Sequence, residues 1–477
     1  MNNNIIITSM EVMTKSMQAN ADAFHVNVIY NSIYLRAFQQ AIKEITMEKN
    51  RTISDLYDRW LNLIDKEVNR ELKSESFVSL LSRFINSGLD LRSALRRAGY
   101  PAQYFDWLFD SYIRSLMVFA SVPKEFDLTP FDIEYVKEKT RLLHYHDIAT
   151  KDDDNNNNDK GQAKRNKKPV LITYAQINRF YIMDIRADIS IIRNLLSNGL
   201  DVYLLDWGYP SLEDSSMSVN DYVNYVRVAV EYIKGKTDFE KISLLGYCWG
   251  GIIALIYTAL DNNNESINSL SLMAAPVDFS KDNTILANWA KAVDADKIVD
   301  EFGHLDGQIL DLAFLMRNPP RYVFDKYLKL FEKLDDKKFV ENFISVEKWL
   351  YDTPIIPGKF FRKIINDCYK NNLLISNKMK IEDDKEDIDK EGLRVGISGR
   401  EKNERQINLK NISVPLLTIV AEQDDLVSPE ATLAINDYVS SKDKRSISIP
   451  GGHVGLCISK NAHRKLWPEV AKWILSK

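Results

Sequence analysis

Residues 244–251 read LLGYCWGG, and this stretch decides the fold. The run before it, Ile242 to Leu245, is mostly apolar and is typical of a short buried strand, while residues 252–260 (IIALIYTAL) are typical of an apolar helix. Between them, two glycines flank Cys248 in a G-x-C-x-G pattern. A strand, a tight turn bearing a nucleophile and a helix form the context of a nucleophile elbow, here with cysteine in place of serine. The helix N-terminus would favour a thiolate, so the stretch predicts a cysteine that transfers acyl groups.

The composition is that of an ordinary soluble globular protein, with 45% hydrophobic and 27% charged residues in 477. This length allows one large domain and a second, smaller unit. A formal net charge of -4 gives no reason to expect nucleic acid as a partner. The 3 cysteines lack a C-x-x-C spacing, which argues against a disulfide scaffold or a structural zinc and fits a reducing cytosol. We find no signal-peptide pattern and no apolar run of roughly 18 residues, so we expect a cytoplasmic protein without a transmembrane segment.

The first part of the chain, residues 1–125, is predicted to be helical. Leu56, Trp60, Leu63 and Ile64 share one helix face, as expected for an amphipathic helix packed on a neighbour or a partner chain. Residues 129–146 predict a connecting helix and strand. Two segments, about 151–168 and 382–405, are so rich in charged and polar residues that we expect disordered or exposed loops.

From Pro169 onward the sequence alternates between strand and helix patterns, which predicts a mostly parallel sheet with helices on both faces. The expected strands are 170–174, 202–205, 242–245, 270–274, 414–420 and 446–449, and the helices between the early strands are 188–197, 219–235 and 252–260. The alternation is interrupted by a helical, aromatic-rich segment, about 280–375, which we expect to be a cap over the active site. The predicted catalytic domain spans 126–477.

A thiol nucleophile needs a base within hydrogen-bond reach and a third group that orients the base. In α/β-hydrolases these residues follow strand ends in the order nucleophile, acid, histidine. Asp424 follows the strand 414–420, with Asp425 as the second choice for the acid, and His453 lies in a glycine-rich loop after the next strand. Any one of these residues alone could be structural. Their joint order and context predict an α/β-hydrolase fold with a catalytic triad of Cys248, Asp424 and His453.

The oxyanion of a thioester reaction needs preorganised donors. The elbow geometry predicts the backbone N–H of Trp249 as one donor, and residues 175–177 as the source of the second. The remaining cysteines, Cys368 and Cys457, lie in no such context, and we expect them to be structural. Because His144, His146 and His304 lack nearby partners at metal-ligand spacing, we expect neither a metal nor a cofactor.

Several segments are similar to the polyhydroxyalkanoate synthases, in particular the two-subunit (class III) kind. The resemblance rests on residues 178–184 (NRFYIMD), 201–210 (DVYLLDWGYP), 246–251 (GYCWGG), 275–279 (APVDF), 347–349 (EKW), 421–424 (AEQD) and 452–455 (GHVG). The chain departs from the family at Asp425, where histidine is frequent, and at Ser428, where proline is frequent. Residues 56–60 (LYDRW) and 74–77 (SESF) faintly resemble the accessory subunit of these synthases. The simpler interpretation is an unrelated helical extension.

The resemblance implies that the chain polymerises 3-hydroxyacyl-CoA, with 3-hydroxybutyryl-CoA as the expected substrate, and releases CoA. His453 would deprotonate Cys248, which carries the growing polyester chain. Asp424 would act through His453 or assist deprotonation of the attacking 3-hydroxyl. The resemblance further implies a location at the surface of cytoplasmic polyester granules and a partnership with an accessory subunit or a second copy. Two alternatives remain: a thioesterase or polyester depolymerase with the same triad, and a non-catalytic granule scaffold.

Overall fold

The computed structural model describes residues 128–146, 167–318, 321–322, 326, 336–382 and 404–477. The helical N-terminal region predicted over 1–125 lies outside these residues, as do most of the predicted loops 151–168 and 382–405. The described residues form two compact units. One holds those within 284–303 and 308–351, and the other holds those within 123–283, 304–307 and 352–477.

The larger unit is built on an 8-stranded sheet in the order β1-β2-β6-β3-β7-β8-β13-β14. Its strands are β1 (Phe131–Lys137), β2 (Thr140–Tyr145), β3 (Pro169–Thr173), β6 (Asp201–Asp206), β7 (Ile242–Tyr247), β8 (Ile267–Met273), β13 (Leu416–Ala421) and β14 (Lys444–Ile449). From β6 to β14 all neighbouring strands pair in parallel. The central strands β3, β7 and β13 are buried along their whole length, because helices cover both faces of a parallel sheet. The predicted α/β-hydrolase fold, with a mostly parallel sheet, is confirmed.

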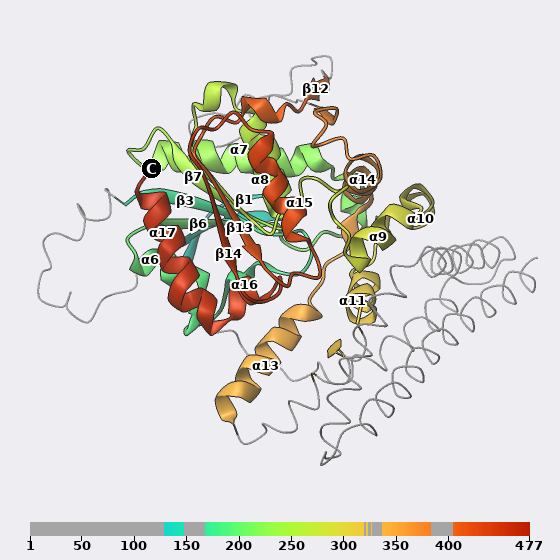
Figure 1. Cartoon of the computed structure of the whole chain (residues 1–477), viewed down its shortest axis with the longest axis horizontal. Helices are drawn as coiled ribbons and strands as arrows, with labels where there is room; N and C mark the ends of the chain where they lie inside the picture. Colours follow the sequence, from blue (N-terminus) through green and yellow to red (C-terminus); the bar gives the residue numbers. More distant parts are fainter. Residues whose placement is uncertain (1–127, 147–166, 319–320, 323–325, 327–335, 383–403) are drawn as a thin grey trace, which may run out of the picture. The chain divides into compact units, whose positions relative to one another are not determined.

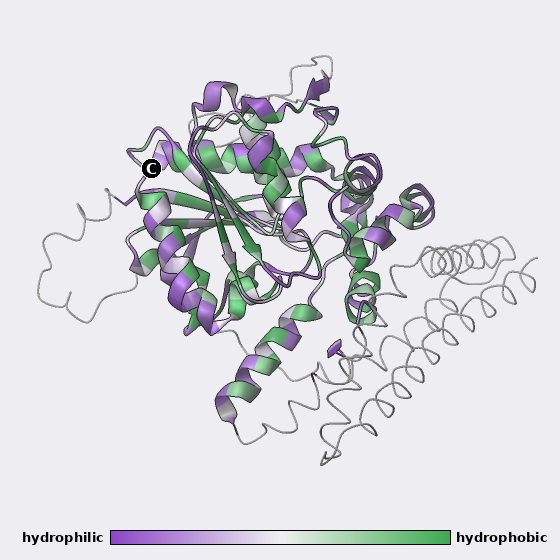
Figure 2. Cartoon of the chain, viewed as in Figure 1, coloured by the Kyte–Doolittle hydropathy of each residue, from purple (hydrophilic) through white to green (hydrophobic). Residues whose placement is uncertain are grey.

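Helices pack on both faces of this sheet (Figure 1). α7 (Val219–Lys236) packs with α8 (Trp249–Leu260) on one face, and α6 (Ile191–Ser197) packs with α17 (Trp467–Leu475) on the other. Shorter helices in this unit are α14 (Gly358–Lys363), the π-helix η6 (Ile364–Lys370), α15 (Pro429–Leu433) and α16 (Gly455–Ile458). In Figure 2 the central strands are hydrophobic or neutral, whereas the helices alternate hydrophobic and hydrophilic turns. This pattern is that of helices with one face on a core.

Local sequence signals set the starts of several helices. Ser218 and Asp221 form a capping box at the start of α7, and Ser428 caps α15 with Pro429 in the first turn. The helix expected from Asp188 instead begins at Ile191, because the Ser190 side chain accepts the Arg193 backbone N–H and caps the helix there. Residues 189–190 form the short strand β5, which pairs with β4 (Asp184–Arg186).

The helix predicted within residues 129–146 is wrong. This segment is an antiparallel hairpin of β1 and β2, turning at Glu138, whose φ is 55°. The charged residues around the turn suggest a helix when the sequence is read locally. β2 also pairs with β6, about sixty positions further along the chain, and this partner is invisible to a local pattern.

The smaller unit is helical, as expected for its aromatic-rich sequence. Its helices are α9 (Ile285–Ala292), α10 (Ala295–Phe302), α11 (Gly307–Met316, of which Gly307 falls in the sheet unit) and α13 (Lys337–Leu350). From residue 352 onward the chain belongs to the sheet unit again, including α14 and η6. In this unit β10 (Ile356–Pro357) pairs with β9 (His304–Leu305), and β11 (Lys380–Glu382) pairs with β12 (Glu404–Gln406). The predicted domain limits and the role of a cap remain predictions.

Gly250 offers a test of how tightly the sheet and α8 are packed. A Cβ at this position would lie 2.2 Å from the Tyr174 carbonyl oxygen, a backbone atom that cannot turn away. We expect Gly250→Ala to lower the free energy of unfolding by about 1–3 kcal/mol or more, because the strand and helix must separate.

The matched control is Gly235→Ala in α7, where nothing lies within 4 Å of the added Cβ. Removing a glycine from an exposed helical position should stabilise the protein by roughly 0.5–1 kcal/mol. Urea denaturation of both variants checks this, and equal stability of Gly250→Ala and the wild type would contradict the described packing.

Candidate active site

Cys248 lies in the turn between β7 and α8 with a φ of 52° and a ψ of -126°. A positive φ is strained for a residue with a side chain and is held here by its surroundings. The backbone N–H of Cys248 donates to the Met273 carbonyl at 2.9 Å, and a Cβ on Gly246 would lie 2.4 Å from the Cα of Gly251. The strand and the helix therefore cross at a distance that only glycines permit. This is the geometry of the predicted nucleophile elbow.

Asp424 and His453 follow the ends of β13 and β14, which lie beyond β8 on one side of β7 in the sheet. The Nδ1 atom of His453 lies 2.7 Å from Asp424 Oδ2. The other oxygen of Asp424 accepts the backbone N–H groups of Leu426 and Val427, both at 2.9 Å. Both oxygens are thus engaged, which fixes the carboxylate against the imidazole ring. Of the two adjacent aspartates, Asp424 is the one that bonds to His453.

Cys248 lies close enough to His453 to raise the pKa of its imidazole, so the structure brings the three predicted residues together. His453 is buried, with 5% of its surface exposed. Burial alone would lower the pKa of His453, but the charges of Asp424 and Cys248 raise it to about 10. This arrangement favours the protonated imidazolium form of His453. The catalytic assignment of these residues remains a prediction.

The two other cysteines differ from Cys248 in their surroundings. Cys368 and Cys457 are completely buried, and burial raises the pKa of both thiols. A raised pKa keeps a thiol neutral and inert. Cys457 nevertheless lies near the candidate site, because its thiol is close to Tyr247, whose ring lies 5.0 Å from the ring of His453. The proximity of Cys457 to His453 was not predicted from the sequence.

A cluster of aromatic side chains lies beside the elbow. The indole Nε1 of Trp249 donates to the Tyr369 hydroxyl at 3.2 Å, and the Tyr369 ring packs edge-on against Phe279 at 4.6 Å. Phe360 lies 5.9 Å from Trp249, measured between ring centroids. Burial and the Asp282 carboxylate raise the pKa of Tyr369, so its hydroxyl keeps its proton. The sequence held no local signal for Tyr369, since it meets Trp249 only through the fold.

The loop after β3, from which a second oxyanion donor is predicted, lies directly against the elbow. The Thr173 hydroxyl donates to the Gly250 carbonyl at 2.9 Å, and the Tyr174 carbonyl lies against Gly250 itself. Ala175 and Gln176 are both 5% exposed, and neither polar atom of the Gln176 side chain has a hydrogen-bond partner. The two oxyanion donors, including the Trp249 backbone N–H, remain predictions.

Two features are absent from the described part of the chain. Among those residues there is no group of three or more His, Cys, Asp or Glu side chains with a metal-binding arrangement. No helix there is long and apolar enough to traverse a lipid bilayer. His144, which the sequence left without partners, lies between Glu134 at 2.9 Å and Asp201 at 2.7 Å.

The sheet order and the elbow define a member of the α/β-hydrolase fold, and the model of that family matches residues 182–457. The chain is 36% identical to the poly(3-hydroxyalkanoate) polymerase subunit PhaC of Allochromatium vinosum, over 66% of this chain and 82% of that protein. It is 34% identical to the PhaC subunit of Haloarcula marismortui, over 72% of this chain and 67% of that protein. The monoacylglycerol lipase structure of Paleococcus ferrophilus covers 65% of this chain and 94% of its own, with 14% identity and a TM-score of 0.39.

The chain belongs to the poly(3-hydroxyalkanoate) polymerase family. The resemblance inferred from the sequence motifs is confirmed.

The role of Asp424 in holding His453 charged can be tested with Asp424→Asn. Removing the carboxylate charge leaves burial as the dominant influence, so the pKa of His453 should fall by about 1–3 pH units. A histidine whose pKa is raised by folding stabilises the protein at low pH, and that contribution is lost as the pH rises through about 10 in the wild type. In the variant it should be lost at a lower pH. NMR titration of the ring, assigned by its disappearance in His453→Gln, measures the shift, and an unchanged pKa would contradict the coupling.

Proposed function

We propose that this protein polymerises 3-hydroxyacyl-CoA into polyhydroxyalkanoate, with release of CoA, through a thioester on Cys248. The observation that carries the proposal is the chain of contacts from Asp424 through His453 to the strained, partly accessible Cys248. Membership of the polymerase family supports the same reaction. We further propose 3-hydroxybutyryl-CoA as the substrate.

In the first step the Cys248 thiolate attacks the thioester carbonyl of the substrate. The oxyanion that forms is stabilised by the Trp249 backbone N–H and by a second N–H from residues 175–177. When the intermediate collapses, the bond from carbon to the CoA sulfur breaks. The CoA thiolate takes the proton held by His453, and the acyl group remains on Cys248.

In the second step the 3-hydroxyl group of another hydroxyacyl unit attacks this thioester. Its proton passes to His453, an ester bond forms and the Cys248 thiolate is released. Asp424 holds the charged ring of His453, or it assists in removing the proton from the 3-hydroxyl. Repetition of the two steps lengthens the polyester by one unit each time.

The acyl group on Cys248 must be transferred to a hydroxyl group faster than water hydrolyses it, because hydrolysis would end the growth of the polyester. The aromatic cluster around Trp249, Phe279, Phe360 and Tyr369 supports transfer, because it surrounds the start of α8 with apolar surface. The helical segment within 280–375, as a cap, would add to this exclusion of water. The nucleophile is a cysteine, whereas many hydrolases use a serine, and this also favours acyl transfer over hydrolysis.

The product is a water-insoluble polyester, so we place the enzyme at the surface of polyester granules in the cytoplasm. An accessory subunit or a second copy of the chain is the proposed partner. Two other functions use the same residues differently. A thioesterase or depolymerase would use the triad with water as acceptor, and a granule scaffold would need no nucleophile at all.

The nucleophile is tested with Cys248→Ala and purified full-length protein incubated with 3-hydroxybutyryl-CoA. Because the thiolate forms the covalent intermediate, CoA release should fall by at least about a thousandfold. Cys368→Ala, which removes a buried thiol outside the triad, is the matched control and should keep its rate within about twofold.

The product separates the three functions in the same assay, run with and without a granule extract that supplies an accessory subunit. Insoluble polymer from the wild type supports the polymerase. Free 3-hydroxybutyrate supports the hydrolase instead, and no CoA release under either condition leaves the scaffold. Full activity of Cys248→Ala would refute the proposed intermediate.

A further inference from the structure

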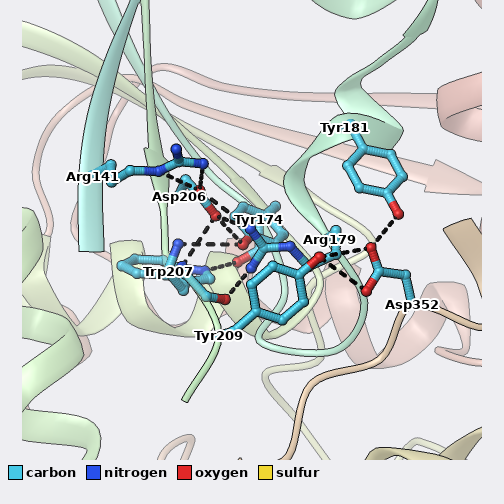
Figure 3. Close-up of polar contacts among 9 residues, drawn as sticks. Arg141, Tyr174, Arg179, Tyr181, Asp206, Trp207, Tyr209 and Asp352 are labelled. Carbon is cyan, nitrogen blue, oxygen red and sulfur yellow. Dashed lines mark hydrogen bonds and ion pairs between the residues drawn. The ribbon is translucent and has the colours of Figure 1, made fainter. Parts of the chain in front are cut away.

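A buried ion pair lies beside the loop that follows β3 (Figure 3). Arg179 is 3% exposed and Asp206, at the end of β6, is 0% exposed. The Nη2 atom of Arg179 lies 3.0 Å from Asp206 Oδ1, and its Nη1 donates to the carbonyl of Gly208. A buried guanidinium without partners is very costly, so this position strongly constrains the backbone on both sides of Arg179.

Asp206 is held by several donors at once, from β2 and from the segments that follow β3 and β6. Arg141 on β2 contributes an ion pair at 2.5 Å, and the Tyr174 hydroxyl donates at 3.1 Å. The backbone N–H of Gly208 donates to the same carboxylate at 3.1 Å. The carboxylate therefore has a fixed place at the carboxyl edge of the sheet, and Arg179 is fixed with it.

Two arginines, Arg141 and Arg179, share the single negative charge of Asp206. A second carboxylate, Asp352, lies near Arg179 and supplies another negative charge. The Arg179 guanidinium stacks on the Tyr209 ring at 3.8 Å, and the Tyr209 hydroxyl donates to Asp352 at 2.9 Å. The Tyr181 hydroxyl donates to the same carboxylate at 2.5 Å, and Figure 3 shows the two tyrosines converging on Asp352. Burial and Asp352 raise the pKa of Tyr181, so its hydroxyl remains a donor.

Asp352 is the first residue of the sheet unit after the segment 308–351, so its hydrogen bonds fix the point at which the chain re-enters this unit. The next residue is tied to the same loop, because the Asn178 side-chain amide donates to the Thr353 hydroxyl at 2.6 Å. Three residues of the loop after β3, namely Asn178, Arg179 and Tyr181, thus bond to fixed groups outside it.

The other end of the loop is fixed at the elbow. The Tyr174 carbonyl accepts the indole N–H of Trp207 at 2.8 Å and lies against Gly250, two residues after Cys248. Residues 175–177 therefore run between two anchors, Tyr174 and Arg179. Asn178 turns the chain with a φ of 62°. A short segment held at both ends has little freedom to move its backbone N–H groups.

From these contacts we infer that Arg179 is a positioning residue for the reaction: with Asp206, Tyr209 and Asp352 it holds residues 175–177 against Cys248. The inference rests on the proposed function, in which this segment supplies the second oxyanion donor. Losing one such donor lowers kcat by about 10²–10³-fold, and a misplaced donor should lower kcat by a smaller factor. The effect should fall on kcat, since the oxyanion exists only in the transition state and the intermediate.

The test uses graded variants of the full-length enzyme with 3-hydroxybutyryl-CoA as substrate. Arg179→Lys keeps the charge but loses the planar fork, and Arg179→Met loses both. We expect kcat to fall by about tenfold in the first and about a hundredfold in the second, with KM changed by less than about threefold.

Because changing a buried arginine can unfold the protein, Tyr209→Phe serves as a milder variant. It keeps the ring under Arg179 and removes only the hydroxyl bond to Asp352, on a residue that is 54% exposed. Its kcat should fall about threefold to tenfold with an unchanged melting temperature.

The matched control is Tyr225→Phe in α7. It also removes a hydroxyl bond to a carboxylate, that of Glu138, away from the loop after β3. Its kcat should stay within about twofold of the wild type.

A purely structural network predicts a different result. In that case folded Tyr209→Phe and Arg179→Lys keep the wild-type kcat, or their activity falls only in proportion to the folded fraction, and either result overturns the inference. If the wild type itself releases no CoA with or without a partner, the proposed function fails and the positioning role fails with it. Polymer from the wild type together with unimpaired folded variants refutes the positioning role alone.

Discussion

The close crossing of β7 and α8 is the constraint on which the rest of the structure depends. Gly246 and Gly251 let the strand and the helix approach so closely that a Cβ on Gly246 would lie 2.4 Å from the Cα of Gly251. This crossing holds Cys248 at a positive φ. The parallel strands then bring Asp424 and His453 to the same edge of the sheet. Backbone packing therefore sets the positions of the three candidate site residues.

Two buried charge systems stand at this edge and complement each other. One is the imidazole of His453 between Asp424 and Cys248, in which burial alone would favour the neutral ring and the neighbouring charges favour the cation. The other is Arg179 with its two carboxylates, which shapes the loop beside the elbow. Both place ions where water is scarce, so each depends on good pairing. In the reaction that we propose, the first system carries out the proton transfers, and we infer that the second holds the backbone donors in place.

Much of the fold was predictable from the sequence because its signals are local. The buried strands, the capping box at Ser218 and the G-x-C-x-G turn each occupy a few adjacent residues. The order of Cys248, Asp424 and His453 could be proposed because each follows a strand pattern. The hairpin β1–β2 was mistaken for a helix and strand, since its partner β6 is remote in sequence. The links from Arg179 to Asp206 and to Tyr209, and from Trp249 to Tyr369, join residues that only the folded sheet brings together.

The central claim is that Cys248 carries the growing acyl chain, and isolating the covalent intermediate tests it most directly. The wild-type enzyme would be quenched with acid during turnover of 3-hydroxybutyryl-CoA and digested, and the peptide containing residues 244–251 weighed by mass spectrometry. The account predicts a series of adducts on Cys248 that differ by whole hydroxybutyryl units. Adducts on another residue, or steady CoA release with an unmodified Cys248 peptide throughout, would contradict it.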